Sequence, residues 1–138
     1  MRYTLLPNTD LRVSVIAMGC WALAGDMTWG EQSEGDSIDA VHAALDLGIN
    51  FFDTAPGYGD GLSERRLGKG LAGRRDRALI ATKLGPDALR GPALVASVER
   101  SLANLGSDHV DLLQIHWASR DVPLDETWAA LERLREQG

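Results

Sequence analysis

Strict alternation of strand-like and helix-like segments is the feature that most constrains how this chain folds. Each of four short apolar runs is followed by a segment with helical spacing of apolar residues, and the runs span residues 15–18, 49–53, 78–83 and 110–116. The helices are predicted to begin near Ser33, Ser63, Gly91 and Pro123. Turn-forming residues 7–10 join two further strand-like pieces, residues 3–6 and 11–13, into a predicted N-terminal hairpin. This order predicts an α/β fold with a parallel sheet.

Two architectures fit that order, an open doubly wound sheet and part of a strand–helix barrel. The doubly wound sheet predicts a glycine-rich phosphate loop after the first strand. Residues 19–25 read Gly-Cys-Trp-Ala-Leu-Ala-Gly, which does not match Gly-x-Gly-x-x-Gly. A complete barrel has eight strand–helix units and needs about 250 residues. Because this chain has four units in 138 residues, it would form half of such a barrel, and both architectures remain open on these patterns alone.

Local patterns predict how the helices begin and which side faces the core. Ser33 and Ser63 are predicted N-caps, and residues 20–32 are predicted to form a loop. Apolar residues at helical spacing predict the buried side of the last two helices, namely Leu94, Val95, Val98, Leu102 and Leu105, and then Trp128, Leu131 and Leu134.

Composition excludes several classes of function. Fourteen Lys and Arg against twenty Asp and Glu give a net charge of -6, which argues against general nucleic-acid binding. The single cysteine, Cys20, rules out an internal disulfide, and with no signal-peptide pattern it favours a cytoplasmic location. The apolar runs are too short to span a membrane, and there is no metal-ligand spacing such as His-Glu-x-x-His. We therefore expect no nucleic-acid, membrane or metal partner.

Ionisable residues end three of the four predicted strands. Side-chain alternation places Asp53, Lys83 and His116 each in an inward-facing series. Parallel strands bring these ends to one edge of the sheet, where active sites form in both barrels and open sheets. Tyr58 follows on the loop over that edge. Taken singly, each residue has an ordinary structural explanation as a turn cap, a snorkelling lysine or a core histidine, but the three together favour an active site.

These residue types suit proton donation to a carbonyl oxygen. A free tyrosine has a pKa of about 10, which is high for proton transfer at neutral pH. A neighbouring lysine cation favours tyrosinate and so lowers a tyrosine pKa. An aspartate keeps that lysine charged and in place, and a histidine can donate a hydrogen bond to the substrate oxygen. The set is suited to protonating a carbonyl oxygen while a nucleophile attacks its carbon.

Four ordered motifs make the chain similar to a known family. They are residues 52–59 (Phe-Asp-Thr-Ala-Pro-Gly-Tyr-Gly), residues 63–68 (Ser-Glu-Arg-Arg-Leu-Gly), residues 81–83 (Ala-Thr-Lys) and residues 106–117 (Gly-Ser-Asp-His-Val-Asp-Leu-Leu-Gln-Ile-His-Trp). Over nearly its whole length the chain resembles the N-terminal half of the aldo-keto reductases. The resemblance implies a TIM-barrel type α/β fold, closed at the bottom by the hairpin, of which residues 1–138 would form half, with no second domain. It also implies reduction of aldehydes or ketones with NADPH.

The resemblance also implies roles for individual residues. Tyr58 would be the general acid, assisted by Lys83, while Asp53 would pair with Lys83 and His116 would orient the carbonyl. Residues beside the cofactor would be Gly19, Cys20, Trp21 and Asp53. The substrate pocket would include Trp29, Tyr58, His116 and Trp117; for Trp29 and Trp117, core or rim packing is an equally good explanation.

The main departure from the family is length. The family residues that hold most of the cofactor lie on later strands than the four found here. We therefore expect a truncated gene product, a partial sequence or a designed half, which alone is weak or inactive and can self-associate through its open sheet edges. The alternative is a non-catalytic, cofactor-sensing or regulatory subunit with the same fold.

Overall fold

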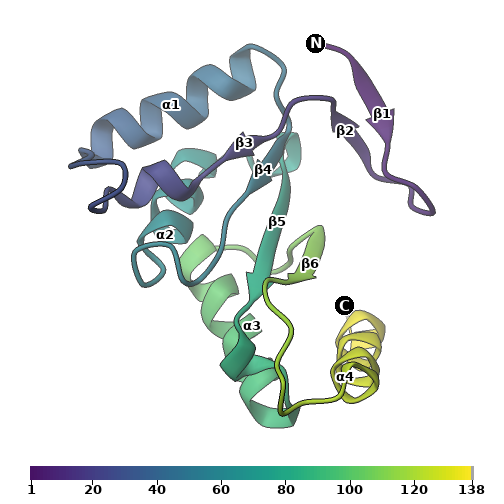
Figure 1. Ribbon diagram of the computed structural model, residues 1–138. Coiled ribbons are helices and arrows are strands. Elements are labelled where there is room, and N and C mark those ends of the chain that lie inside the picture. The colour runs from purple at the N-terminus through teal and green to yellow at the C-terminus, as the bar shows by residue number, and fades with distance from the viewer. Residues whose placement is uncertain (138) are drawn as a thin grey trace.

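The computed structural model describes residues 1–137, and Figure 1 shows the arrangement of its elements. An antiparallel hairpin of β1 (Tyr3–Leu5) and β2 (Arg12–Ser14) stands apart from a four-stranded parallel sheet. The parallel strands are β3 (Met18–Gly19), β4 (Phe51–Asp53), β5 (Leu79–Leu84) and β6 (Leu112–Ile115). The α-helices are α1 (Glu34–Asp46), α2 (Leu62–Leu71), α3 (Gly91–Leu105) and α4 (Leu124–Gln137). Short 3-10 helices are η1 (Trp21–Ala24), η2 (Arg75–Arg77) and η3 (Pro86–Ala88).

Every strand of the parallel sheet lies beside the strand that follows it along the chain, in the order β3-β4-β5-β6. A doubly wound sheet reverses its strand order at a switch point, whereas a strand–helix barrel does not. The chain passes through α1, α2 and α3 between successive strands, and Figure 1 shows these helices gathered on one side of the sheet. Of the two architectures open to the sequence, the topology matches the barrel.

Side-chain alternation divides the parallel sheet into an outer face covered by helices and an inner face. Phe52 of β4 and Ile80 of β5 are buried on the outer face in an apolar cluster with α1 and α2. A second cluster joins β5, β6, α3 and α4. The inner-facing side chains Phe51, Leu79 and Leu112 remain partly exposed. The described part of the chain therefore has one completed hydrophobic layer and one open one.

Helix starts agree with the sequence pattern at Ser33 but not at Ser63. The Ser33 hydroxyl accepts a hydrogen bond from the Asp36 amide (2.9 Å), as a capping serine does. Ser63 lies inside α2, which is preceded by Gly61 at a positive φ of 76°. The prediction that Ser63 is an N-cap is therefore wrong. A glycine begins this helix because the turn before it needs a left-handed conformation.

The first parallel strand begins at Met18 rather than at Val15 as predicted. Val15 and Ile16 are exposed. The Ser14 amide donates to Asn50 Oδ1 (2.7 Å), and the Ser14 hydroxyl donates to the Ile16 carbonyl oxygen (2.7 Å). These bonds bend the chain between the hairpin and the sheet, so strand pairing starts only after the bend.

The predicted core-facing sides of the last two helices are only partly correct. Val95 and Trp128 are exposed, and they line an open groove of about 540 Å³ between α3 and α4. The buried residues of α4 are Thr127 and Ala130. The Thr127 hydroxyl donates to the Leu89 carbonyl oxygen (2.9 Å), which turns this side of α4 inward and the neighbouring Trp128 outward.

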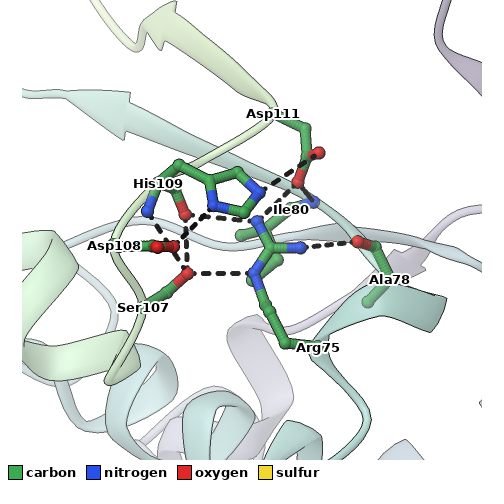
Figure 2. Close-up of polar contacts among 7 residues, drawn as sticks. All are labelled: Arg75, Ala78, Ile80, Ser107, Asp108, His109 and Asp111. Atoms are coloured by element: carbon green, nitrogen blue, oxygen red, sulfur yellow. Dashed lines mark hydrogen bonds and ion pairs between the residues drawn. The ribbon is translucent and has the colours of Figure 1, made fainter. Parts of the chain in front are cut away.

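An ion pair joins the segments that precede β5 and β6, and Figure 2 shows its contacts. It lies at the N-terminal end of these strands, whereas the predicted site lies at their C-terminal end. Arg75 Nη2 lies 2.7 Å from Asp111 Oδ2, and the same oxygen accepts from the Ile80 amide (2.8 Å). The other Arg75 nitrogens donate to Ser107 Oγ (3.0 Å) and to the Ala78 carbonyl oxygen (2.6 Å). The network thus connects β5 and β6 on the N-terminal side of the residues that pair in the sheet.

Candidate active site

Asp53 and Lys83 form a close ion pair across neighbouring strands. Lys83 Nζ lies 2.6 Å from Asp53 Oδ2 and donates to the Thr54 carbonyl oxygen at 2.9 Å. Both residues are inner-facing, as alternation along β4 and β5 predicts. The Lys83 side chain is only 11% exposed, and a mostly buried cation is stable there because the carboxylate lies beside it.

Tyr58 reaches the same ammonium from the loop after β4. Lys83 Nζ lies 3.3 Å from Tyr58 Oη and 5.0 Å from the centroid of its ring. The turn is held by the Tyr58 amide, which donates to the Ala55 carbonyl oxygen (3.1 Å). Gly59 follows at a φ of 60°, and a Cβ there would lie 2.8 Å from Ala24 Cβ, so this turn packs tightly on η1. The loop therefore aims the tyrosine hydroxyl at the lysine.

His116 completes the cluster from the residue after β6. Its backbone amide donates to the Leu84 carbonyl oxygen (2.9 Å), which continues the strand pairing. Its ring meets the Tyr58 ring edge-on, with centroids 5.8 Å apart. Burial and then the Lys83 cation lower the pKa of His116 below its ordinary value, against an opposing effect of Asp53. A neutral imidazole can donate one N–H without adding a second charge beside Lys83.

A continuous row of aromatic rings crosses the site with Tyr58 at its middle. Trp21 stacks on Tyr58 with centroids 5.6 Å apart, and Trp29 meets Trp21 edge-on at 6.0 Å. On the other side, Trp117 stacks on His116 at 5.7 Å. The three tryptophans are exposed. The row thus gives the polar cluster an apolar rim, and Trp29 and Trp117 form its two ends.

Gly19 and Cys20, which the resemblance implies lie beside a cofactor, differ in exposure, because Gly19 is exposed and Cys20 is buried. Gly19 is paired with Asp53 in the sheet, and a Cβ there would meet nothing within 4 Å. Cys20 is fully buried, its amide donates to the Asp53 carbonyl oxygen (2.8 Å), and its own carbonyl accepts from Ser63 Oγ (2.6 Å). Burial, reinforced by the Asp53 charge, raises the pKa of the Cys20 thiol to about 12. The position of Cys20 restricts it to supporting the loop from beneath.

Sequence reasoning missed Gln114 as a member of the site. Gln114 Nε2 donates to Asp53 Oδ1 at 3.2 Å, so each carboxylate oxygen has its own partner. Alternation along β6 places Gln114 on the inner face, but it does not indicate which neighbour the amide contacts.

Sequence reasoning also missed the buried carboxylate of Glu64. Its two oxygens accept from Thr82 Oγ1 (2.8 Å) and from Asn104 Nδ2 (2.9 Å). Glu64 thus ties α2 to β5 and α3. Because Thr82 immediately precedes Lys83, this tie holds the strand that carries the lysine.

Within residues 1–137, no three His, Cys, Asp or Glu side chains group in a way that could hold a metal ion. None of the described helices is both long and apolar enough to cross a membrane.

Comparison with known proteins gives consistent matches. Residues 15–138 match the model of the Aldo/keto reductase family. Aldo-keto reductase YhdN of Bacillus subtilis (strain 168) is 39% identical, over 100% of this chain and 44% of the relative. The crystal structure of the thermostable aldo-keto reductase Tm1743 with the inhibitor epalrestat gives a TM-score of 0.92 at 32% identity, over 100% of this chain and 51% of that one. An aldo-keto reductase from Klebsiella pneumoniae in complex with NADPH gives 0.84 at 31% identity, over 92% and 43%.

The chain thus spans about half the length, or less, of these relatives. Its parallel sheet and covering helices correspond to part of a TIM-type α/β barrel.

Proposed function

Because the chain belongs to the aldo/keto reductase family, we propose that it reduces aldehyde or ketone carbonyls with NADPH, using Tyr58 as the general acid. The observation that carries the proposal is the position of Lys83 Nζ, 3.3 Å from Tyr58 Oη and 2.6 Å from Asp53 Oδ2. A cation fixed beside a phenol stabilises the phenolate that remains after proton donation. We further propose that residues 1–138 form the N-terminal half of the barrel and are weakly active or inactive alone.

The residues present fit one side of a nicotinamide cofactor. The open space at Gly19 lies beside Asp53 at the ends of β3 and β4, and Trp21 is the exposed ring next to it in sequence. Gly19, Trp21 and Asp53 would border the cofactor, and Cys20 would support their loop. NADPH supplies a hydride when bound. The preference for NADPH over NADH rests on the ligand of the Klebsiella pneumoniae relative.

The residues of this chain would supply the proton that the carbonyl oxygen receives. The Tyr58 hydroxyl gives its proton to the carbonyl oxygen, and the Lys83 cation stabilises the resulting phenolate. Asp53 holds Lys83 in place through one oxygen, while its other oxygen is held by Gln114. The neutral His116 ring donates a hydrogen bond to the same carbonyl oxygen and orients it. Trp29 and Trp117, at the two ends of the aromatic row, would exclude water from the substrate.

Substitution of Tyr58 tests the proposal directly. NADPH oxidation is followed with a panel of aldehydes and ketones, using the 138-residue chain and the full-length protein in parallel. In the form that turns over, Tyr58→Phe is expected to lower kcat by roughly 10²–10⁴-fold, because it removes the general acid. The matched control is Tyr3→Phe, since the hydroxyl of Tyr3 donates to the Gly48 carbonyl oxygen beside the hairpin (2.8 Å), away from the site.

Two outcomes would contradict the proposal. Absence of turnover with every carbonyl in the full-length protein would exclude the reductase, and NADPH binding without turnover would favour the regulatory alternative. Equal kcat values for Tyr58→Phe and the parent would exclude Tyr58 as the acid while leaving the reaction itself in place. Running each assay with NADH tests the cofactor preference separately.

A further inference from the structure

Residues 21–32 form a strap that carries both Trp21 and Trp29, and helix α2 fastens this strap at both ends. The hydroxyl of Ser63 donates to the carbonyl oxygen of Cys20, just before the strap (2.6 Å). The guanidinium of Arg66 donates to the carbonyl oxygens of Leu23 and Gln32, the latter at 2.9 Å. Ser63 and Arg66 are three residues apart, so they lie on one face of α2 and contact the strap together.

The Arg66 head group is committed to this contact. Its Nε is buried and has no hydrogen-bond partner within residues 1–137, so its bonds to the strap come from the two terminal nitrogens. A planar guanidinium reaches two separated acceptors at once, which a lysine ammonium on a flexible stem does less well. Loss of this side chain would leave two carbonyl groups without their bonds from α2.

The strap is also tied internally around Trp21. The Trp21 indole nitrogen donates to Asp26 Oδ2 (2.7 Å), and Asp26 Oδ1 accepts from the amides of Thr28 and Trp29 (2.8 and 3.1 Å). The ring of Trp21 therefore moves with the strap as a unit. Because that ring stacks on Tyr58 at 5.6 Å with an interplanar angle of 18°, the position of the strap bears on the position of the tyrosine.

We propose that Arg66 is a positioning residue that fixes the strap and holds Trp21 against Tyr58, which keeps the Tyr58 hydroxyl beside Lys83. The part that concerns Tyr58 as a proton donor rests on the function proposed above. The part that concerns Trp21 does not, and the first measurement tests it without any substrate.

Near-ultraviolet circular dichroism of the 138-residue chain isolates the Trp21 signal. The signal is the difference between each protein and its Trp21→Phe variant, taken in the parent, Arg66→Met and Lys69→Met backgrounds. Lys69 is the matched control, because it lies one turn further along α2 and pairs with Glu34 at the exposed surface (2.7 Å). We expect the Trp21 signal to persist in the parent and in Lys69→Met, and to be largely lost in Arg66→Met.

Far-ultraviolet circular dichroism shows whether each variant is folded. A conservative variant keeps the test decisive if Arg66→Met does not fold. Arg66→Lys keeps the charge but replaces the planar fork, so it is expected to keep the fold with a smaller Trp21 signal than the parent. An unchanged Trp21 signal in folded Arg66→Met or, if that variant does not fold, in Arg66→Lys would overturn the proposal.

Kinetics of the form that reduces carbonyls test the consequence for Tyr58. Arg66→Met is expected to lower kcat between about tenfold and 10²-fold through misplacement of the acid. Full kcat together with a lost Trp21 signal would overturn the positioning role. Absence of turnover in every form would remove the proposed function instead, and the Trp21 signal would still decide whether Arg66 holds the strap.

Discussion

The pKa of His116 is affected by two nearby charges of opposite sign. Its pKa lies below the ordinary value of 6.5 because of burial and the Lys83 cation, while Asp53 acts in the opposite direction. The unfolded chain therefore binds a proton more readily than the folded one. The contribution of His116 to stability is present above pH 6.5 and is lost as the pH falls through the lower folded-state pKa.

We predict that the C2 proton of His116 titrates with a midpoint below 6.5 in nuclear magnetic resonance spectra. Lys83→Met is expected to raise that midpoint, because it removes the cation and leaves the Asp53 carboxylate unpaired nearby. Lys69→Met, which removes an exposed charge on α2, should leave it unchanged. A midpoint that does not move in Lys83→Met would show that Lys83 does not act on His116.

We also predict that the Cys20 thiol is unreactive in the folded protein. Its pKa is raised to about 12 by burial and by the Asp53 charge, and its side chain is fully buried. A disulfide reagent should report no reaction under native conditions and one thiol per chain after denaturation, since Cys20 is the single cysteine. Fast native labelling would mean that the loop after β3 opens readily.

Single residues differ in how far the sequence alone could place them. Alternation predicted that Asp53 and Lys83 meet, because a strand fixes the direction of each side chain. The Tyr58 ring depends on a turn that packs on η1 at Gly59, a contact between distant segments. The partners of Arg66 are backbone carbonyl groups, which leave no signature in the residue types. Polar contacts to the backbone therefore could not be predicted from the sequence, and neither could the side-chain partners of Gln114 and Glu64.

Helix α2 is the element on which the site depends most. The stretch Ser-Glu-Arg-Arg-Leu-Gly at residues 63–68 places a different contact at almost every position. Its serine and second arginine fasten the strap, its glutamate bonds β5 and α3, and its leucine is buried in the core. The final glycine, Gly68, allows α3 to approach, because a Cβ there would overlap the backbone carbonyl of Leu105.

Replacing Gly68 by alanine sets two effects against each other. Alanine favours a helix by about 1 kcal/mol over glycine, but the overlap with Leu105 is with backbone and cannot be relieved by a side-chain rotation. We expect Gly68→Ala to lower the free energy of unfolding by up to about 2 kcal/mol, because overpacking costs about 1–3 kcal/mol and the helix gain offsets about 1 kcal/mol of it. Urea denaturation measures the difference.

The control for this prediction is Gly35→Ala in the first turn of α1. A Cβ at Gly35 would meet only Ser33 Oγ, at an ordinary 3.8 Å. This variant is expected to be neutral or stabilising by up to about 1 kcal/mol. If both alanine variants behaved alike, close packing of α2 on α3 would not be the reason for the glycine.

Element boundaries were predictable where the signal was local. Ser33 followed by acids marks the start of α1, because the cap and the charges act within one turn. The pattern failed for Val15, which has the composition of a strand residue but lies at the bend that the Ser14 and Asn50 bonds impose. It failed in the same way for Trp128, which a bond from Thr127 to the Leu89 carbonyl oxygen, just after η3, turns toward solvent. Tertiary contacts overrode local preference in both places.

In the molecule as a whole, the described parallel sheet has β3 and β6 at its two edges and an inner face without a covering layer. Edges of this kind carry unpaired N–H and C=O groups that can pair with another chain. The alternation of units was enough to predict a parallel sheet. The order of the strands, which separates the barrel from the doubly wound sheet, needed the structure.

A polypeptide of residues 1–138 expressed alone is predicted to self-associate. Light scattering should report a mass above that of the monomer, rising with protein concentration. Leu112→Lys, on the inner face of β6, is expected to reduce the association by placing a charge there. If the polypeptide stays monomeric at all concentrations and unfolds cooperatively, the prediction is wrong, because the open edges then do not pair with another chain.

The alternation of faces along β5 has a genetic consequence. Lys83 faces the interior only because it follows Leu79, which also faces inward, by an even number of positions along the strand. Deleting one codon within this strand would turn Lys83 toward the helices and bring Leu84 into its place at the site. Substitutions at the outer positions change the packing against the helices gradually. An in-frame deletion would instead move every later side chain of the strand to the opposite face at once. We therefore expect natural variation in this strand to be by substitution, with length changes confined to the loops that follow the strands.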